Sequence, residues 1–238
     1  MTPLALEILD VSKDYRALRP LRLKRLAVGT GESVAILGFN QTSAEVFFNL
    51  VTGASLPDTG EVRLFGETTA AITDGEAWLS TLDRIGIVSD RAVLLEQLTV
   101  TQNLAMPFTL EVEPPPIEIR VRAERLAREV GLGESTWSTR LGATDAGVRA
   151  RTRLGRAMAY DPKLLVLEHA SATLAASESS AFACDVRRLA ADRRIAVVAA
   201  TADETFARGV AARVLVLDAA SGELSERRRS RWFGRRLG

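Results

Sequence analysis

Four short runs of mostly apolar residues are spaced along the chain. They are 33–37 (SVAIL), 85–88 (IGIV), 164–167 (LLVL) and 195–200 (IAVVAA). Unbroken apolar runs of this length are typical of strands that are buried on both faces, as in a parallel sheet covered by helices. The runs therefore predict a parallel core sheet.

Between these runs, apolar positions recur at helical spacing. Helices are predicted over 43–51, which stops at Gly53, over 117–130, which follows three prolines and stops at Gly131, and over 177–193. Proline before a helix and glycine after it are common boundary residues. Strands that alternate with helices indicate an α/β domain.

The N-terminal part has a different pattern. Residues 4–11 alternate between apolar and polar, and a hairpin-like Asp58-Thr59-Gly60 precedes a second strand over 61–65. These features predict an antiparallel sheet beside the core. The stretch from about 96 to 145 is helical in pattern and interrupted by prolines, which predicts a helical insertion.

Composition supports one globular domain, because 47% of the 238 residues are hydrophobic and 26% are charged. No apolar run approaches the roughly 18 residues of a membrane helix, and the N-terminus lacks a signal-peptide pattern. One cysteine, Cys184, and one histidine, His169, leave no zinc-binding set, and no residue is assigned to a metal. We expect a cytoplasmic protein.

The net charge of +1 conceals a basic C-terminus. Residues 227–238 hold six arginines and no acid, whereas the whole chain has only three lysines, at Lys13, Lys24 and Lys163. The tail is either a contact for anionic lipid, nucleic acid or an acidic partner, or a solvated end of the chain. We therefore divide the chain into a domain over 1–226 and a basic tail over 227–238.

The order of these elements and six local strings resemble the nucleotide-binding subunits of ATP-binding cassette (ABC) transporters. The strings are 6–15 (LEILDVSKDY), 34–45 (VAILGFNQTSAE), 56–66 (LPDTGEVRLFG), 85–103 (IGIVSDRAVLLEQLTVTQN), 155–167 (GRAMAYDPKLLVL) and 199–203 (AATAD). The resemblance covers about 4–217. It implies a P-loop NTPase-like ABC ATPase fold, with a mixed or parallel core sheet, an N-terminal antiparallel β subdomain and a helical insertion.

The phosphate loop of that family has the form GxxxxGK[ST]. Its glycines expose backbone amides, its lysine neutralises phosphates and its hydroxyl holds magnesium. The corresponding residues here, which the resemblance makes the candidate ATP contacts, are Gly38, Phe39, Asn40, Gln41, Thr42, Ser43, Ala44 and Glu45. Ser43, Ala44 and Glu45 replace the second glycine, the lysine and the hydroxyl residue. No lysine lies between Lys24 and Lys163, so realignment cannot restore the charge.

These replacements change the charge beside the phosphates by −2. One charge pair at about 4 Å and an effective dielectric near 20 is worth about 4 kcal/mol before desolvation. Glu45, in the first turn of the predicted helix, is expected to interact with the positive helix end in place of a ligand.

Other motif positions also depart from the family. They are Asp90 at the glutamine-loop position, 144–148 (TDAGV) at the signature, Glu168 at the magnesium-binding acid, His169 at the catalytic glutamate, Ala175 at the D-loop aspartate and Ala202 at the switch histidine. An ATPase of this kind depends on positioning, magnesium and electrostatic stabilisation. Almost every contributor is altered.

Several roles stay open at this stage. Tyr15 is either a platform for adenine stacking or a half-buried tyrosine at a strand end. Glu168 and His169 are candidate catalytic residues, as a magnesium carboxylate and a general base, or structural residues. Residues 40–42 either bind a small anion or cap the helix at Ser43.

Two further segments have alternative interpretations. Arg149, Arg151, Arg153 and Arg156 form either a nucleic-acid patch or, as we expect, a solvated helix face. Residues 93–108 (VLLEQLTVTQNLAMPF) lie where the family's subunits receive their membrane partners. They form either that interface, which we favour, or the core of the helical insertion.

We therefore expect an ABC transporter subunit with lost or strongly weakened ATP binding and hydrolysis, in which ATP and magnesium bind weakly or not at all. It would serve as a structural or regulatory half beside an active ABC subunit and a membrane permease, at the inner face of the membrane, without specific nucleic-acid binding. One alternative is a divergent but active ATPase. Another is a protein-binding module unrelated to transport.

Overall fold

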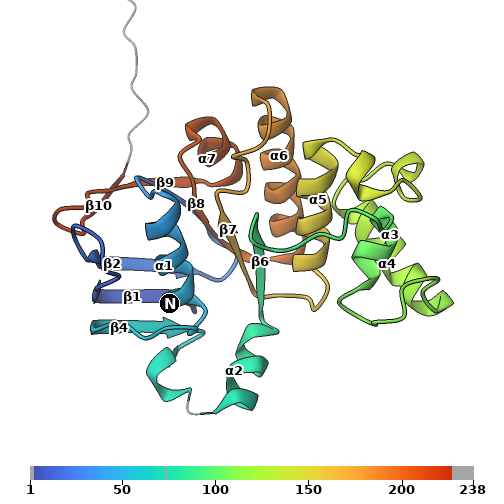
Figure 1. Ribbon diagram of the computed structural model, residues 1–238. Coiled ribbons are helices and arrows are strands. Elements are labelled where there is room, and N and C mark those ends of the chain that lie inside the picture. Colours follow the sequence, from blue (N-terminus) through green and yellow to red (C-terminus); the bar gives the residue numbers. More distant parts are fainter. Residues whose placement is uncertain (1–2, 73, 227–238) are drawn as a thin grey trace, which may run out of the picture.

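A six-stranded sheet forms the centre of the computed structural model, which describes residues 3–72 and 74–226 (Figure 1). Its strand order is β10, β9, β3, β8, β7, β6. The parallel strands are β3 (Ser33–Leu37), β6 (Ile85–Ser89), β7 (Leu164–Glu168), β8 (Ala196–Ala200) and β9 (Arg213–Leu217). The short β10 (Leu224–Glu226) pairs antiparallel with β9. All four apolar runs lie in this sheet, so the predicted parallel core is confirmed.

A second sheet packs beside it and is antiparallel, as predicted. Its order is β2, β1, β4, β5, and the strands are β1 (Leu4–Lys13), β2 (Leu21–Gly29), β4 (Thr59–Leu64) and β5 (Glu67–Thr68).

The hairpin predicted at Asp58-Thr59-Gly60 is wrong. The element before β4 is a helix, and β4 pairs with the distant strand β1. Gly60 has a φ of +81°, and a Cβ there would overlap the carbonyl oxygen of Asp10, where the register between β1 and β4 shifts. The glycine therefore permits a close approach of two strands, which resembles a turn in the sequence.

Seven α-helices surround the sheets in the described part of the chain. They are α1 (Gln41–Val51), α2 (Gly75–Leu82), α3 (Val100–Ala105), α4 (Ile117–Glu129), α5 (Ala146–Ala157), α6 (Ala176–Arg193) and α7 (Glu204–Val210). Short 3-10 turns occupy Thr69–Ala71, Glu134–Thr136 and Leu141–Ala143. The predicted helices over 117–130 and 177–193 match α4 and α6, whereas α1 begins two residues before its predicted start.

Hydrophobic side chains fill both faces of the central sheet. One cluster lies between the two sheets and includes the inner face of α1, with Phe47 and Ile36 fully buried. The other cluster lies under α5, α6 and α7 and continues into α3 and α4, with Phe182 and Leu104 fully buried. Figure 1 shows α3 and α4 beyond α5, on the side away from the antiparallel sheet.

The helical insertion lies between β6 and β7, where α3 and α4 are found. Its limits at about 96 and 145, and the division at 226, stay predictions. The arginine-rich tail, 227–238, lies outside the described residues. In the part of the chain that is described, no helix is both long and apolar enough to cross a bilayer.

Candidate functional site

The predicted site residues converge at one edge of the central sheet. Because β3, β6, β7 and β8 run parallel, their carboxyl ends share an edge, which is where ligands bind in open α/β sheets. Gly38 follows β3, Asp90 follows β6, Glu168 ends β7 and Thr201 follows β8. The topology thus assembles segments that are far apart in the sequence.

The loop after β3 closes on itself at the start of α1. Asn40 is the N-cap: its Oδ1 accepts from the Ser43 backbone N–H at 2.8 Å, and the Ser43 Oγ accepts from the Asn40 backbone N–H at 3.0 Å. A reciprocal capping box of this kind satisfies two donors. The capping interpretation holds, but the cap is Asn40 rather than Ser43. Two backbone donors of the candidate phosphate loop therefore already have partners within the loop.

The expectation for Glu45 is wrong. Because α1 begins at Gln41, Glu45 is its fifth residue, and the first turn of the helix contains no acid. Its Oε1 instead lies 2.8 Å from Nη1 of Arg91, in the loop after β6. Glu45 therefore pairs with a side chain of a distant segment and not with the end of its own helix.

Arg91 also binds Glu168. The Glu168 Oε2 accepts from Nε of Arg91 at 3.0 Å and from Nη2 at 2.7 Å. The Glu168 side chain is 1% exposed and that of Arg91 is 42% exposed. One guanidinium thus joins carboxylates from α1 and β7, and we call Glu45, Arg91 and Glu168 the ion triad. Sequence reasoning did not identify Arg91 as a site residue.

Asp90 points to a different partner. Its Oδ1 lies 3.0 Å from Nη1 of Arg153 on α5, and the Arg153 side chain is 18% exposed. Adjacent residues of this loop therefore form ion pairs with different elements: Asp90 pairs with α5, and Arg91 pairs with α1 and β7.

His169 shows no arrangement for acid–base chemistry. Its φ is +44°, its backbone N–H donates to the Ala200 carbonyl at 2.9 Å, and its Nε2 is buried without a hydrogen-bond partner among residues 3–72 and 74–226. A general base needs a group that orients it and a proton within reach. The geometry supports the structural interpretation of His169.

Some of the remaining candidate residues are buried in the core and others are exposed. Phe39 is 4% exposed, with its ring centroid 5.0 Å from that of Phe47, and Ala44 is fully buried. Gly38 has a φ of +103°, and a Cβ there would lie 2.8 Å from the Leu217 carbonyl oxygen. Tyr15 packs half-buried against the same cluster, and its stacking role stays a prediction. Gln41 and Thr42 are exposed.

The segment at the signature position, 144–148, caps the start of α5. Asp145 is the N-cap of α5, and its Oδ1 accepts from the Val148 backbone N–H at 2.7 Å. The Thr144 hydroxyl donates to the Leu141 carbonyl at 2.7 Å. The polar side chains of this segment are thus engaged in local capping.

The arginines of α5 do not form the expected solvated face. Arg151 donates to the Asp185 carboxylate at 2.7 and 3.0 Å, Arg153 pairs with Asp90, and Arg149 reaches the Gly142 carbonyl. Arg156 donates to the Val93 carbonyl at 2.6 Å, and burial lowers its guanidinium pKa. All four guanidinium groups bind other groups within the described part of the chain and are only partly exposed.

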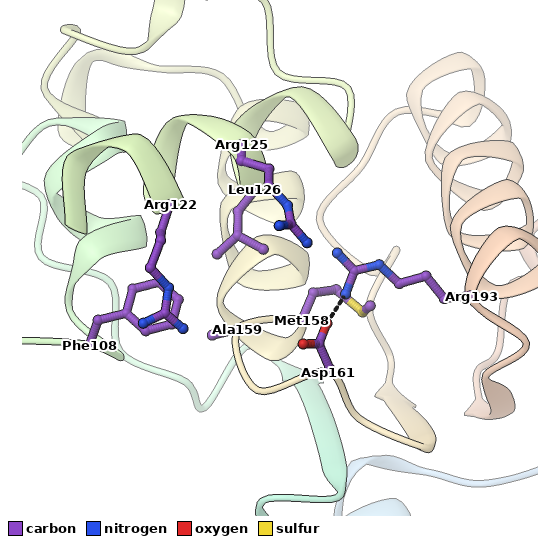
Figure 2. Close-up of a pocket in the computed structure, with 8 residues that line it drawn as sticks. All are labelled: Phe108, Arg122, Arg125, Leu126, Met158, Ala159, Asp161 and Arg193. Carbon is purple, nitrogen blue, oxygen red and sulfur yellow. Dashed lines mark hydrogen bonds and ion pairs between the residues drawn. The ribbon is translucent and has the colours of Figure 1, made fainter. Parts of the chain in front are cut away.

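A cationic cavity of about 90 Å³ lies between α4 and the ends of α5 and α6 (Figure 2). Arg193 binds Asp161 at 2.6 Å and also pairs with Glu129, which Arg125 reaches at 3.0 Å. The Arg122 guanidinium lies 3.8 Å from the ring centroid of Phe108. Ion pairs of the chain itself and four apolar side chains therefore border the cavity.

An apolar groove of about 400 Å³ lies between α2, β6 and the end of α5. Leu79, Ile87 and Tyr160 line it and are 58%, 38% and 56% exposed. The segment 93–108 contributes to both interpretations made for it: Leu94 and Pro107 line the groove, whereas its residues Leu98, Val100, Leu104 and Ala105 are buried in the core.

Asp203 organises the turn after β8. Burial raises its carboxyl pKa, but hydrogen bonds from the Ser179 hydroxyl, the Phe206 backbone N–H, the Ser171 hydroxyl and the Thr205 backbone N–H outweigh this and lower the pKa overall. Asp203 is also the N-cap of α7. The position beside it, Ala202, thus precedes a structural carboxylate.

We expect Asp203→Ala to lower the free energy of unfolding by about 1 kcal/mol at pH 7, the usual effect of losing a helix cap. Because the folded pKa is depressed, this contribution is present above the unfolded pKa of about 3.9 and is lost as pH falls through the folded value. Urea unfolding at pH 7 and pH 3 measures both effects. Asp203→Asn, which keeps an acceptor and cannot titrate, is expected to retain the cap and flatten the pH dependence. Equal pH dependence in wild type and Asp203→Asn would contradict the assignment.

Comparison with known proteins gives consistent results. A sequence model of the family described as "ABC transporter" matches residues 22–172. The sulfate/thiosulfate import ATP-binding protein CysA of Methylococcus capsulatus is 31% identical over 223 residues, covering 91% of this chain and 61% of that protein. The chain thus spans about three-fifths of the length of the relatives that it matches.

Solved structures show the same fold. CbiO1 from Clostridium perfringens, described as part of the ABC transporter complex cbiONQ, superposes with a TM-score of 0.78 at 20% identity, covering 94% of this chain and 87% of that one. The dimeric ATP-binding cassette MJ0796, bound to ADP and Pi, gives 0.75 at 23% identity, covering 94% and 98%. The expected mixed sheet with its antiparallel β subdomain is therefore confirmed.

Proposed function

The chain belongs to the ABC transporter family, and from this membership we propose that it is an ATP-binding-type subunit of a transport complex in which ATP binding and hydrolysis are lost or strongly weakened. The observation that carries the proposal is the ion triad, because it commits a guanidinium beside the candidate phosphate loop to two carboxylates of the chain itself.

The residues present do not fit a nucleotide with magnesium. Ala44, at the position of the lysine, is fully buried and has no charge. Glu45 and Glu168 together outweigh the one charge of Arg91, so the triad has a net charge of −1. Phosphate binding depends on positive charge and free backbone N–H groups, and here both are reduced. We derive no hydrolytic step through this site.

The partner in this proposal is a membrane permease, with a second, active ABC subunit beside it at the inner face of the membrane. The groove lined by Leu79, Ile87 and Tyr160 supports it, since exposed apolar side chains that gather in one concavity are typical of docking surfaces. The relatives carry the words "import ATP-binding protein" in their names, which supports transport as the class of function. We place the core domain at 1–226, with its helical part at about 96–145.

Isothermal titration of the purified chain with ATP and ADP, with and without magnesium, tests the proposal. We expect no binding at millimolar nucleotide, because losing one phosphate–cation pair weakens affinity by about three orders of magnitude. A dissociation constant below about 100 μM, which corresponds to more than 5 kcal/mol of binding free energy, would contradict it. That outcome would favour the active ATPase, for which magnesium-dependent phosphate release should be lost in His169→Ala. A stable complex with a protein other than a permease would favour the binding module.

A further inference from the structure

In the ion triad, two carboxylates surround one positive group, as the ligands of a small cation site would surround a metal ion. Two carboxylates from different elements, Glu45 on α1 and Glu168 on β7, approach one positive group at 2.7–3.0 Å. Glu168 is nine-tenths or more buried, and its Oε1 has no hydrogen-bond partner among the residues described. A buried carboxylate without a counter-charge is strongly unfavourable. The positive group is therefore required for this arrangement.

The chain supplies that positive group from a loop that is held in place locally. The Arg91 backbone N–H donates to the Ser89 hydroxyl at 3.1 Å, and the Ala92 N–H donates to the Ser89 carbonyl at 3.0 Å. Asp90, the residue before Arg91, forms an ion pair with Arg153. The loop is thus shaped as a turn that presents Arg91 to the two carboxylates.

We propose that the Arg91 guanidinium is the resident cation of this site and takes the place of a divalent metal ion between Glu45 and Glu168. Both carboxylates stand at positions that the resemblance assigns to magnesium ligands. This inference rests on the proposed function for the loss of nucleotide binding and deepens it by naming the group that stands in place of the metal ion. The guanidinium joins α1, β7 and the loop after β6 without any bound cofactor.

The triad also fixes the wall of the groove. Ala92 and Leu94 follow Arg91 and line the groove together with Arg153, the partner of Asp90. The covalently attached Arg91 cation ties this loop to the sheet edge, so under this proposal no magnesium ion is needed to hold the groove wall in place.

Manganese and magnesium titrations of the wild type and of Arg91→Met test this proposal. For wild type, we expect no bound Mn²⁺ by electron paramagnetic resonance and a thermal midpoint that moves by less than about 1 °C with either ion. In Arg91→Met the two carboxylates lack a cation, and carboxylates suit both ions. We expect Mn²⁺ to bind to this variant. Its thermal midpoint should rise by about 4 °C when the metal concentration is about ten times the dissociation constant.

Two controls locate the effect. Arg91→Met combined with Glu45→Gln should lose most of the metal response, because one of the two ligands is gone. Arg153→Met removes an equivalent guanidinium from the neighbouring Asp90 pair and should show no metal response. A response in Arg153→Met equal to that in Arg91→Met would overturn the proposal.

The wild-type measurement decides the case even if Arg91→Met does not fold. Binding of Mn²⁺ to wild type with submillimolar affinity would overturn the resident-cation proposal, with or without nucleotide binding. Tight ATP binding without any metal response of the free wild-type chain would overturn the proposed function and leave the resident cation in place. The failures of the two proposals are therefore distinguishable.

Discussion

Arg91→Met is expected to lower the free energy of unfolding by about 3 kcal/mol, the lower end of the range for breaking a buried ion pair by removing one partner. The cause is Glu168, whose side chain is 1% exposed and, among the residues described, accepts hydrogen bonds from Arg91 alone. Methionine preserves much of the apolar stem but leaves the carboxylate without a donor. Urea unfolding in metal-free buffer at pH 7 measures the loss.

The double variant Arg91→Met/Glu168→Gln separates the charge from the contact. If the loss comes from an uncompensated buried carboxylate, neutralising residue 168 should restore more than half of the stability, giving a coupling free energy above about 1 kcal/mol. Arg153→Met is the matched control, because its partner Asp90 is 41% exposed and pairs of that kind contribute about 1 kcal/mol or less. Equal losses in Arg91→Met and Arg153→Met would show that burial of Glu168 has no special effect.

The sequence predicted the strands of the core well because burial on both faces leaves a simple signal. The runs at 33–37 and 164–167 consist almost entirely of apolar residues, and in β7 every residue is buried. Helix α4 was also predictable, since proline precedes it and Gly131, with a φ of +79°, follows its end. Local composition determines such boundaries.

The contacts of the site were not predictable, because they join segments far apart in the chain. Arg91 and Glu168 are 77 positions apart, and Arg151 and Asp185 are 34 apart. An arginine at 91 looks like any polar residue after a strand. Its role follows from the parallel order of β6 and β7, which brings the two strand ends together. One usable signal was present: an acid stands at each magnesium-ligand position, and with only three lysines in the chain an arginine was the more available counter-charge.

Errors at Gly60 and Glu45 have local causes. Glycine with a positive φ occurs both in turns and where two backbones approach closely, so sequence alone does not separate these cases. The helix start was misplaced because Asn40 and Ser43 are both good capping residues, and the reciprocal box uses both. Moving the start by two residues moved Glu45 out of the first turn and removed the basis of the prediction for it.

Asn103→Leu is expected to lower the free energy of unfolding by about 3 kcal/mol. Asn103 is fully buried in α3; its Oδ1 accepts from the Leu95 N–H at 2.9 Å, and its Nδ2 donates to the carbonyls of Leu95 at 2.9 Å and Thr99 at 3.0 Å. Three such hydrogen bonds contribute about 1 kcal/mol each, and leucine has a similar size but no polar group. Urea unfolding measures the loss, and hydrogen exchange should show faster exchange at residues 94–99.

Thr101→Val is the matched control on the same helix. It loses the single hydrogen bond from the Thr101 hydroxyl to the Trp137 carbonyl and should cost about 1 kcal/mol. Faster exchange confined to 94–99 in Asn103→Leu alone would show that one buried amide positions the segment between Arg91 and the helical insertion. Since Leu94 lines the groove, Asn103→Leu should also lower the affinity for any partner that docks there. Unchanged exchange at 94–99 in Asn103→Leu would contradict the assignment of Asn103 as the residue that holds this segment.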